Sequence, residues 1–352
     1  MFVIGIDVHV RNSYMHICRA DGTTFKKGRV ANTLMDFAEF LAPLEGQQVK
    51  AVMESTTNSR PVCVLLQEYA RQAGVDLDLR VLHARKLRLI AASESKCDKI
   101  DGSVLARLAN SNLNLACSYM PDEDVFQLRE LTRTREDFVD SRTVLKCQVH
   151  AILHRRGLLL PEGMDLFSKI GRSWSAEHVT DVVGKAARES LYRLIDAFDV
   201  QIKEFDARLA QAAASPRWKA DHDLLRTMPG VGPVTAMTVL GELGDIGRFK
   251  SRAALSNYAG LVPSNRSSNE KVWQGSIKKQ GPRHLRRVLV EAAWSGVRNS
   301  VTYKGIYEGI VERKGKKLVA ITAVARRMLE DMYTLLKTRS AFKDKSSMSD
   351  AG

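Results

Sequence analysis

The stretch FVIGIDVH, residues 2–9, sets the fold expected for the first part of this chain. Its β-branched apolar residues predict a short strand that ends at an acid, Asp7. A second run, YMHICRA (14–20), follows the polar VRNS, and ADGTT supplies turn residues before a third run, FKKGRVA (25–31). Three strands joined by tight turns predict an antiparallel meander.

After the meander, helical and strand patterns alternate. The expected elements are a helix at 32–44 with an asparagine cap, strands at 49–56 and 77–84, a helix at 60–73, and a further helix within KCDKIDGSVLARLA (96–109). The order βββαβαβ and a following helix predict a mixed α/β sheet flanked by helices.

From about Pro121 the pattern is helical. A long charged helix stops at Gly157, LLLPEGMDLFSKIG (158–171) reads as a loop, and helical spacing resumes from about Ser175 to Ala214. Two long helices that face each other predict a helical hairpin or coiled coil, which serves either as an intramolecular strut or as a dimer arm.

The last third is expected to be helical with glycine- and proline-rich joints. LLRTMPGVGPVTAMTVLGELG (224–244) has the helix-hairpin-helix pattern, in which Gly230 and Gly232 let backbone N–H groups approach a phosphate. We expect domains at 1–120, 121–222 and 223–345, and a disordered tail at 346–352.

Lys plus Arg is 54 and Asp plus Glu is 40, so the net charge of +14 favours a polyanionic partner. The five cysteines lack C-x-x-C spacing and indicate reduced thiols, and no apolar run is long enough to span a membrane. The segment MFVIGIDVHV carries no basic leader, so we expect no signal peptide and a cytoplasmic location.

The acids raise the question of a metal site. Asp98 and Asp101 lie three residues apart at a helix start, where they serve either as helix caps or as ligands. Asp7 and Glu54 each end an apolar strand, where a bare carboxylate carries a desolvation penalty that a divalent cation compensates. First strand, fourth strand and following helix are the places where a ribonuclease H-like fold holds its metals.

The motifs GIDVH, VMEST and DKIDGSVLARLA resemble those of the Asp-Glu-Asp-Asp transposases of the insertion-sequence-110 family, related to Piv-type DNA invertases. The resemblance implies a RuvC-like N-terminal domain. It also implies that Asp7, Glu54, Asp98 and Asp101 bind Mg²⁺, with Mn²⁺ as an alternative. Cys97 replaces the threonine that family members usually have before the third acid.

A second stretch, YAGLVPSNRSSNEKVWQGSIKKQGPRHLRRVLVEAAW (258–294), resembles the C-terminal serine transposase domain of the same family. The nucleophile that it implies is Ser268, with Ser267 as the neighbouring alternative, because Asn269 stands where a glycine is common. Without the resemblance, a serine in a polar turn reads as structural, and no adjacent histidine indicates a hydrolase triad.

The resemblance further implies a recombinase that acts on donor and target DNA through a phosphoserine intermediate. It implies a guide noncoding RNA encoded by the element and a homo-oligomer, dimer or tetramer. Backbone contacts to nucleic acid are expected from Lys96, Lys99, Gly230, Gly232, Arg266, Lys271, Lys278, Lys279, Arg283, Arg286 and Arg287.

Two other functions stay open on the sequence alone. One is a metal-dependent resolvase or nuclease in which water attacks the phosphodiester and the serine is a bystander. The other is a non-catalytic nucleic-acid-binding protein whose acids serve as caps and ion pairs.

Overall fold

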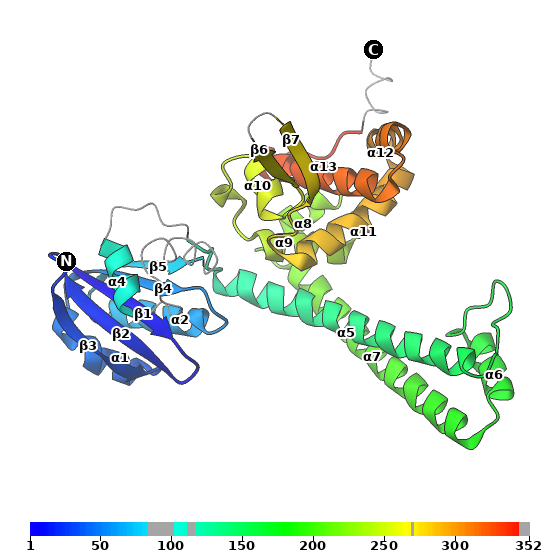
Figure 1. Cartoon of the computed structure of the whole chain (residues 1–352), viewed down its shortest axis with the longest axis horizontal. Helices are drawn as coiled ribbons and strands as arrows, with labels where there is room; N and C mark the ends of the chain where they lie inside the picture. Colours follow the sequence, from blue (N-terminus) through cyan, green and yellow to red (C-terminus); the bar gives the residue numbers. More distant parts are fainter. Residues whose placement is uncertain (84–101, 111–116, 269–270, 345–352) are drawn as a thin grey trace, which may run out of the picture. The chain divides into compact units, whose positions relative to one another are not determined.

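The structure is a computed structural model that describes residues 1–83, 102–110, 117–268 and 271–344, with the backbone alone at 265–268 and 271–274. It divides into two compact units, Met1–Met120 and Pro121–Gly352 (Figure 1). Each unit has its own buried apolar residues.

The first unit is built on a five-stranded sheet with the order β3-β2-β1-β4-β5. Neighbours β1, β2 and β3 pair antiparallel, as the predicted meander requires, and β4 and β5 run parallel to β1. The strands are β1 (Phe2–Val8), β2 (Asn12–Arg19), β3 (Thr24–Ala31), β4 (Gln48–Glu54) and β5 (Asp76–Leu82). This mixed sheet confirms the predicted α/β class and is compatible with a ribonuclease H-like fold.

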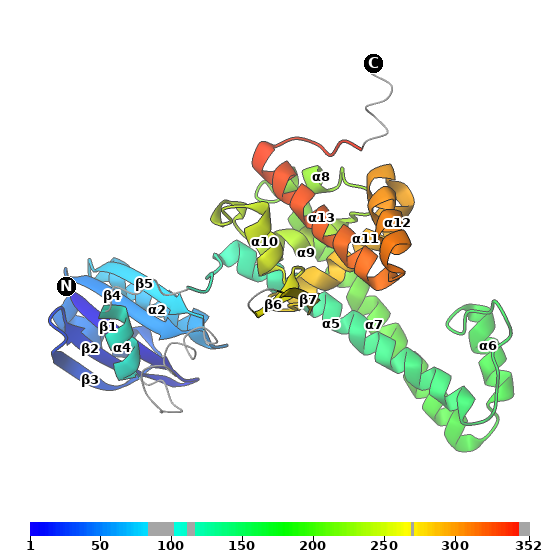
Figure 2. The ribbon, with the colours of Figure 1, turned by 45° about the horizontal axis from the view of Figure 1, so that its top comes forward.

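Helices cover both faces of this sheet. Ile4 and Ile6 of β1 point toward the face covered by α1 (Leu34–Leu41), η1 (Ala42–Leu44) and α2 (Ser59–Gln72). Val3 points to the other face, where it packs with Leu105 and Leu108 of α4 (Gly102–Asn110). Figure 2 shows α4 lying across that face. Burial on both sides explains why β1 is a continuous apolar run and lacks polar alternation.

Two glycines let α4 approach β1 at backbone distance. A Cβ atom on Gly5 would lie 1.9 Å from the carbonyl oxygen of Gly102 and 2.4 Å from the amide nitrogen of Ala106. The first turn of α4 therefore rests directly on the strand, two residues before Asp7.

We expect Gly5→Ala to destabilise the first unit by about 3 kcal/mol, because the new methyl overlaps backbone that cannot move without displacing α4. Hydrogen exchange of the β1 and α4 amides, together with urea denaturation, measures this loss of stability. Gly305→Ala is the matched control, since a Cβ there meets nothing within 4 Å; it lies in a helix and should stabilise by up to about 1 kcal/mol. Wild-type protection in Gly5→Ala would contradict the direct packing of α4 on β1.

The second unit begins with two long helices, α5 (Glu123–His154) and α7 (Val182–Ala214), which lie side by side (Figure 1). The ion pairs Arg135–Asp206 and Arg156–Asp181, 2.5 Å and 2.6 Å long, join them in antiparallel order. A short helix, α6 (Lys169–His178), ends at a break before α7 that the sequence periodicity did not reveal. The remaining chain from 158 to 168 is a loop, as predicted.

Helices and one hairpin form the rest of this unit. They are α8 (Lys219–Leu225), α9 (Pro233–Leu243), η2 (Ile246–Arg248), α10 (Arg252–Tyr258), β6 (Pro263–Ser268), β7 (Lys271–Ile277), α11 (Arg283–Asn299), α12 (Val301–Lys314) and α13 (Lys317–Thr338). Helix α13 packs against α10, α11 and α12. The segment SNRSSNE (264–270), expected to be a polar turn, contributes five of the six residues of β6, which pairs with β7 in a two-stranded sheet.

An ion pair between the partly exposed Arg133 and a buried carboxylate joins α5 to α9. The carboxylate of Glu242, 1% exposed, accepts hydrogen bonds from Arg133 at 2.7 Å and 3.0 Å. This bond raises the pKa of the Arg133 guanidinium. Arg129 also donates to the carbonyl oxygens of Gly241 and Glu242. The α5–α7 arm therefore packs directly against the helices that follow it.

Among the described residues, no helix combines the length and apolar character that crossing a bilayer requires.

Candidate catalytic site

Asp7 and Glu54 lie side by side at one edge of the sheet. Strands β1 and β4 are parallel neighbours, and Ile6 pairs with Met53, so the next position in each strand puts Asp7 beside Glu54. Successive side chains alternate between faces, so both acids lie on the α4 face, with Gly5 and Val52. The carboxyl ends of two strands thus bring together two acids that are 47 positions apart in sequence.

Both carboxylates are half-buried. The Asp7 side chain is 39% exposed, and its Oδ2 atom lies 3.3 Å from Nε2 of His9. In the described part of the chain, no Lys or Arg pairs with Asp7 or Glu54. Asn32 stabilises the turn that follows Asp7, because it donates to the carbonyl oxygen of His9 at 2.8 Å and accepts from Ser13.

The other two predicted ligands, Asp98 and Asp101, lie outside the described residues, as do Lys96 and Lys99. Gly102, which follows Asp101 in sequence, begins α4 against Gly5. Within the ranges that the structure describes, no three His, Cys, Asp or Glu side chains are grouped as a metal site. Asp7 and Glu54 are thus the described part of the predicted set.

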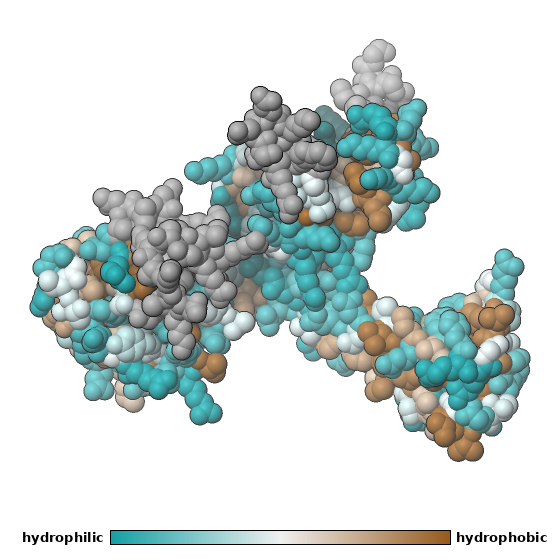
Figure 3. All heavy atoms as spheres, in the orientation of Figure 1, coloured by the Kyte–Doolittle hydropathy of each residue, from teal (hydrophilic) through white to brown (hydrophobic). Residues whose placement is uncertain are grey.

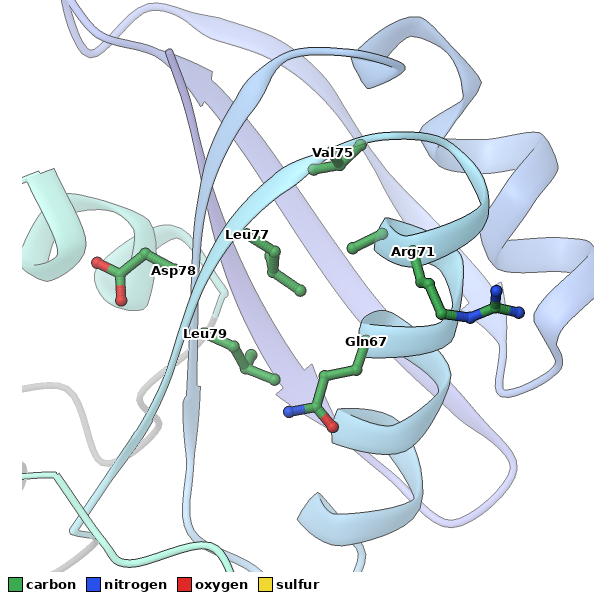
Figure 4. A pocket seen from close by; sticks show the side chains of 7 residues that line it. Gln67, Arg71, Val75, Leu77, Asp78 and Leu79 are labelled. Carbon is green, nitrogen blue, oxygen red and sulfur yellow. The ribbon is translucent and has the colours of Figure 1, made fainter.

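A hollow of about 480 Å³ lies elsewhere on the first unit, between α2 and the edge strand β5 (Figure 4). Leu77 and Leu79, which line it, pack with the core of the α1 and α2 face. It therefore opens on the side of the sheet opposite the two acids and is not part of their site.

Ser268 ends β6 at the tip of the β6-β7 hairpin. It pairs with Lys271, the first residue of β7, and Ser267 pairs with Val272. The segment of 269 and 270 between the strands lies outside the described residues. Both candidate serines therefore stand next to the turn, and Arg266 and Lys271 share the same short ladder.

The base of the hairpin is fixed by two glycines with positive φ. A Cβ on Gly260 would lie 2.2 Å from the carbonyl oxygen of Gln280, and one on Gly281 would lie 1.9 Å from that of Tyr258. The amide of Lys278 also donates to the carbonyl oxygen of Val262 at 3.0 Å. This close backbone contact holds the hairpin at the end of α10.

Two family profiles match this chain. Residues 4–156, which contain the acids, match the profile for the DEDD transposase domain of IS110 elements, and residues 222–308, which contain the serine hairpin, match that described as "Transposase IS116/IS110/IS902 family". The chain belongs to the IS110/IS116/IS902 transposase family.

Individual relatives of this transposase agree with the profiles. It is 26% identical to the transposase for insertion sequence element IS1111A of Coxiella burnetii, over 71% of this chain and 69% of the relative. It is 25% identical to the transposase for IS1328 of Yersinia enterocolitica, over 83% of this chain and 82% of the relative. The match to protein y4qE of Sinorhizobium fredii, 30% identical, spans 57% of this chain and about half, 48%, of that relative.

Not all of the transposase's predicted nucleic-acid contacts are equally available. Arg287 donates to Asp140, Glu136 and Glu291, and the bond to Asp140 raises its pKa. Arg286 donates to the carbonyl oxygens of Ala259 and Gly281, and desolvation lowers its pKa. These contacts favour structural roles for Arg286 and Arg287 over the phosphate contacts predicted from sequence.

The other described cations are more exposed. Arg283 is 67% exposed and lies 3.6 Å from Asp137. Lys278 donates to the side chain of Asn257 at 3.3 Å, and Lys279 has a φ of 51°. They remain candidates for contacts with the DNA backbone.

The two glycines of the transposase's predicted helix-hairpin-helix have different surroundings. Gly230 has a φ of 87°, and a Cβ there would lie 2.4 Å from the carbonyl oxygen of Ala292 and 2.6 Å from the amide nitrogen of Gly296. It packs against α11 and has no room for a phosphate on that side. A Cβ on Gly232 would meet nothing within 4 Å, and this residue precedes α9. Of the two, Gly232 fits the predicted phosphate contact.

Proposed function

We propose that this transposase cleaves and rejoins DNA through a carboxylate-held divalent cation and a serine nucleophile. The metal ligands in this proposal are Asp7, Glu54, Asp98 and Asp101, and the nucleophile is Ser268. The observation that carries the proposal is the register of β1 and β4, in which Ile6 pairs with Met53, so that Asp7 and Glu54 follow at the ends of adjacent parallel strands, on the face where α4 begins. Gly102 follows Asp101 and rests on Gly5, which supports Asp101 as a third ligand.

The donor set fits a hard divalent cation. Asp7 and Glu54 offer carboxylate oxygens that no described Lys or Arg neutralises, and Mg²⁺ prefers such oxygens while it keeps waters for a phosphate. When bound, Mg²⁺ or Mn²⁺ would polarise the phosphodiester and stabilise the leaving oxygen.

Ser268 supplies the covalent chemistry in this proposal. Its Oγ atom bonds to phosphorus while the bond from phosphorus to one deoxyribose oxygen breaks, and the serine proton ends on that oxygen. In the rejoining step a deoxyribose hydroxyl attacks the phosphoserine and regenerates the serine. Lys278 and Lys279, just beyond the hairpin, would offset charge on the phosphate.

Guide RNA and self-assembly belong to the same proposal. The family resemblance implies an element-encoded RNA, and a basic surface suits backbone contacts while base pairing reads sequence. The end of the α5–α7 arm carries exposed apolar side chains, seen as brown surface in Figure 3: Leu159, Ile170, Val182 and Val183. This exposure supports a coiled-coil dimer arm at 121–222. The serine domain of the proposal follows the arm, at 223–345.

Removing divalent cations tests the metal part. With EDTA we expect no strand cleavage of DNA that carries the ends of the element, and we expect added Mg²⁺ or Mn²⁺ to restore it. Zinc is a control, because a carboxylate set without Cys or His ligands disfavours it. Cleavage that persists in EDTA would refute the metal site. The complete absence of cleavage under every condition, with DNA binding intact, would favour the non-catalytic binding protein.

A further inference from the structure

A row of polar side chains continues from the two acids across the sheet. Tyr14 of β2 pairs directly with Asp7, and Arg29 of β3 pairs directly with Tyr14. Side chains directly opposite each other in an antiparallel ladder share a face, so both lie on the face of Asp7 and Glu54. The opposite orientation of Gly28, the residue before Arg29, supports this, because a Cβ on Gly28 would meet the ring of Phe40 of α1 on the other face.

The start of α4 borders this row. The ring of Tyr14 lies 3.4 Å from the Cβ position of Gly102, in the first turn of the helix. Gly5 and His16, two pairs back along the strands and on the same face, lie at the level that α4 covers. Tyr14 is half-buried and Arg29 is exposed.

Arg29 keeps its positive charge without a described carboxylate partner. Its Nε atom donates to Oδ1 of Asn12 at 2.8 Å, and no Asp or Glu in the described ranges forms an ion pair with it. Asn12 lies beside the turn that follows Asp7, so the guanidinium leans toward the end of the sheet where the acids stand. A neutral partner orients the guanidinium and leaves its charge for an anion.

We propose that Tyr14 and Arg29 bind successive phosphates of the DNA strand on which the acids act, so that this strand runs across β4, β1, β2 and β3. Strands lie about 4.8 Å apart, so Tyr14 is one spacing and Arg29 about 10 Å from Asp7. The Tyr14 hydroxyl donates to an oxygen near the reacting phosphate, and Arg29 pairs with the flanking one. The placement of the reacting phosphate at Asp7 and Glu54 rests on the proposed function, whereas the phosphate contact of Arg29 does not.

Salt-dependent binding tests Arg29 apart from catalysis. We expect Arg29→Ala to reduce the slope of log K against log salt for a labelled DNA duplex by about 0.9, as one phosphate contact is lost. The measurement uses full-length protein in EDTA. Lys27→Ala is the matched control: Lys27 is exposed on the same strand and face, but pairs with His16 at the level of α4. An unchanged slope for Arg29→Ala, or the same loss in Lys27→Ala, would overturn the proposal.

Transposition from a plasmid that carries the element with its flanking DNA tests Tyr14 as a positioning residue. We expect Tyr14→Phe to lower its frequency about tenfold, with the wild-type salt slope and wild-type hydrogen exchange in α4. Wild-type frequency in Tyr14→Phe would remove Tyr14 from the path. If Asp7→Asn also transposed normally, the metal site would fail, while the Arg29 slope would still decide whether DNA crosses this face.

Discussion

Asp7→Asn should reduce transposition by about a thousandfold or more while the protein stays folded. Asparagine has nearly the shape of aspartate but lacks the charge that holds a divalent cation, and losing several kcal/mol of transition-state stabilisation gives a change of that size. The fold should tolerate the change, because Asp7 is 39% exposed and its described ion-pair partner is a histidine on the next turn. Transposition from a plasmid that carries the element measures the loss, and circular dichroism measures the fold.

Glu54→Gln should cause the same loss, since Glu54 follows Met53, the partner of Ile6, and so stands beside Asp7. The matched control is Asp78→Asn. Asp78 lies on β5 of the same sheet and the same face, but it forms a 2.7 Å ion pair with Arg80 near the start of the strand. A partly exposed pair contributes little stability, so this variant should transpose normally. Equal transposition by Asp7→Asn and Asp78→Asn would eliminate the metal site as proposed.

The sheet was predictable because short-range patterns define it. The apolar run 2–8, the turn residues at 20–24 and the alternating helices predict the order of elements along the chain, βββαβαβ, and the structure has this order. The proposed phosphate contacts of Tyr14 and Arg29 were not predictable, because their alignment with Asp7 depends on the register of β1, β2 and β3. Strand register is set by pairing between segments that composition alone does not align. Asp98 and Asp101 lie outside the described residues and remain predictions.

The C-terminal part shows where local patterns fail. SNRSSNE has the composition of a turn, but residues 263–277 form a hairpin because Gly260 and Gly281 bring its ends together from across the segment. The sequence predicts a phosphate contact for Arg287, but it does not show that Glu136 and Asp140 of α5 form ion pairs with this side chain. Both features depend on tertiary contacts, which a local reading of sequence cannot include.

The nucleophile is tested most directly by the covalent adduct that it forms. With wild-type protein and end-labelled DNA, we expect a species on a denaturing gel that carries the label at the mass of the protein plus DNA. Ser268→Ala should form none of it and should lose transposition to background, because alanine offers no oxygen to phosphorus. DNA binding and urea denaturation should stay unchanged, since the hairpin is held at its base by Gly260 and Gly281.

Ser267→Ala is the matched control, one residue away on the same strand and paired with Val272. It should keep the adduct and transposition, and the reverse result would move the nucleophile to Ser267. If water attacks the phosphodiester, both variants should release free cut ends, and neither they nor the wild type should form an adduct. Mass spectrometry of the trapped peptide then identifies the modified serine, because nuclease digestion leaves a nucleotide on the Oγ atom that bonded to phosphorus. A labelled adduct without a modified serine in 263–277 would refute the serine mechanism.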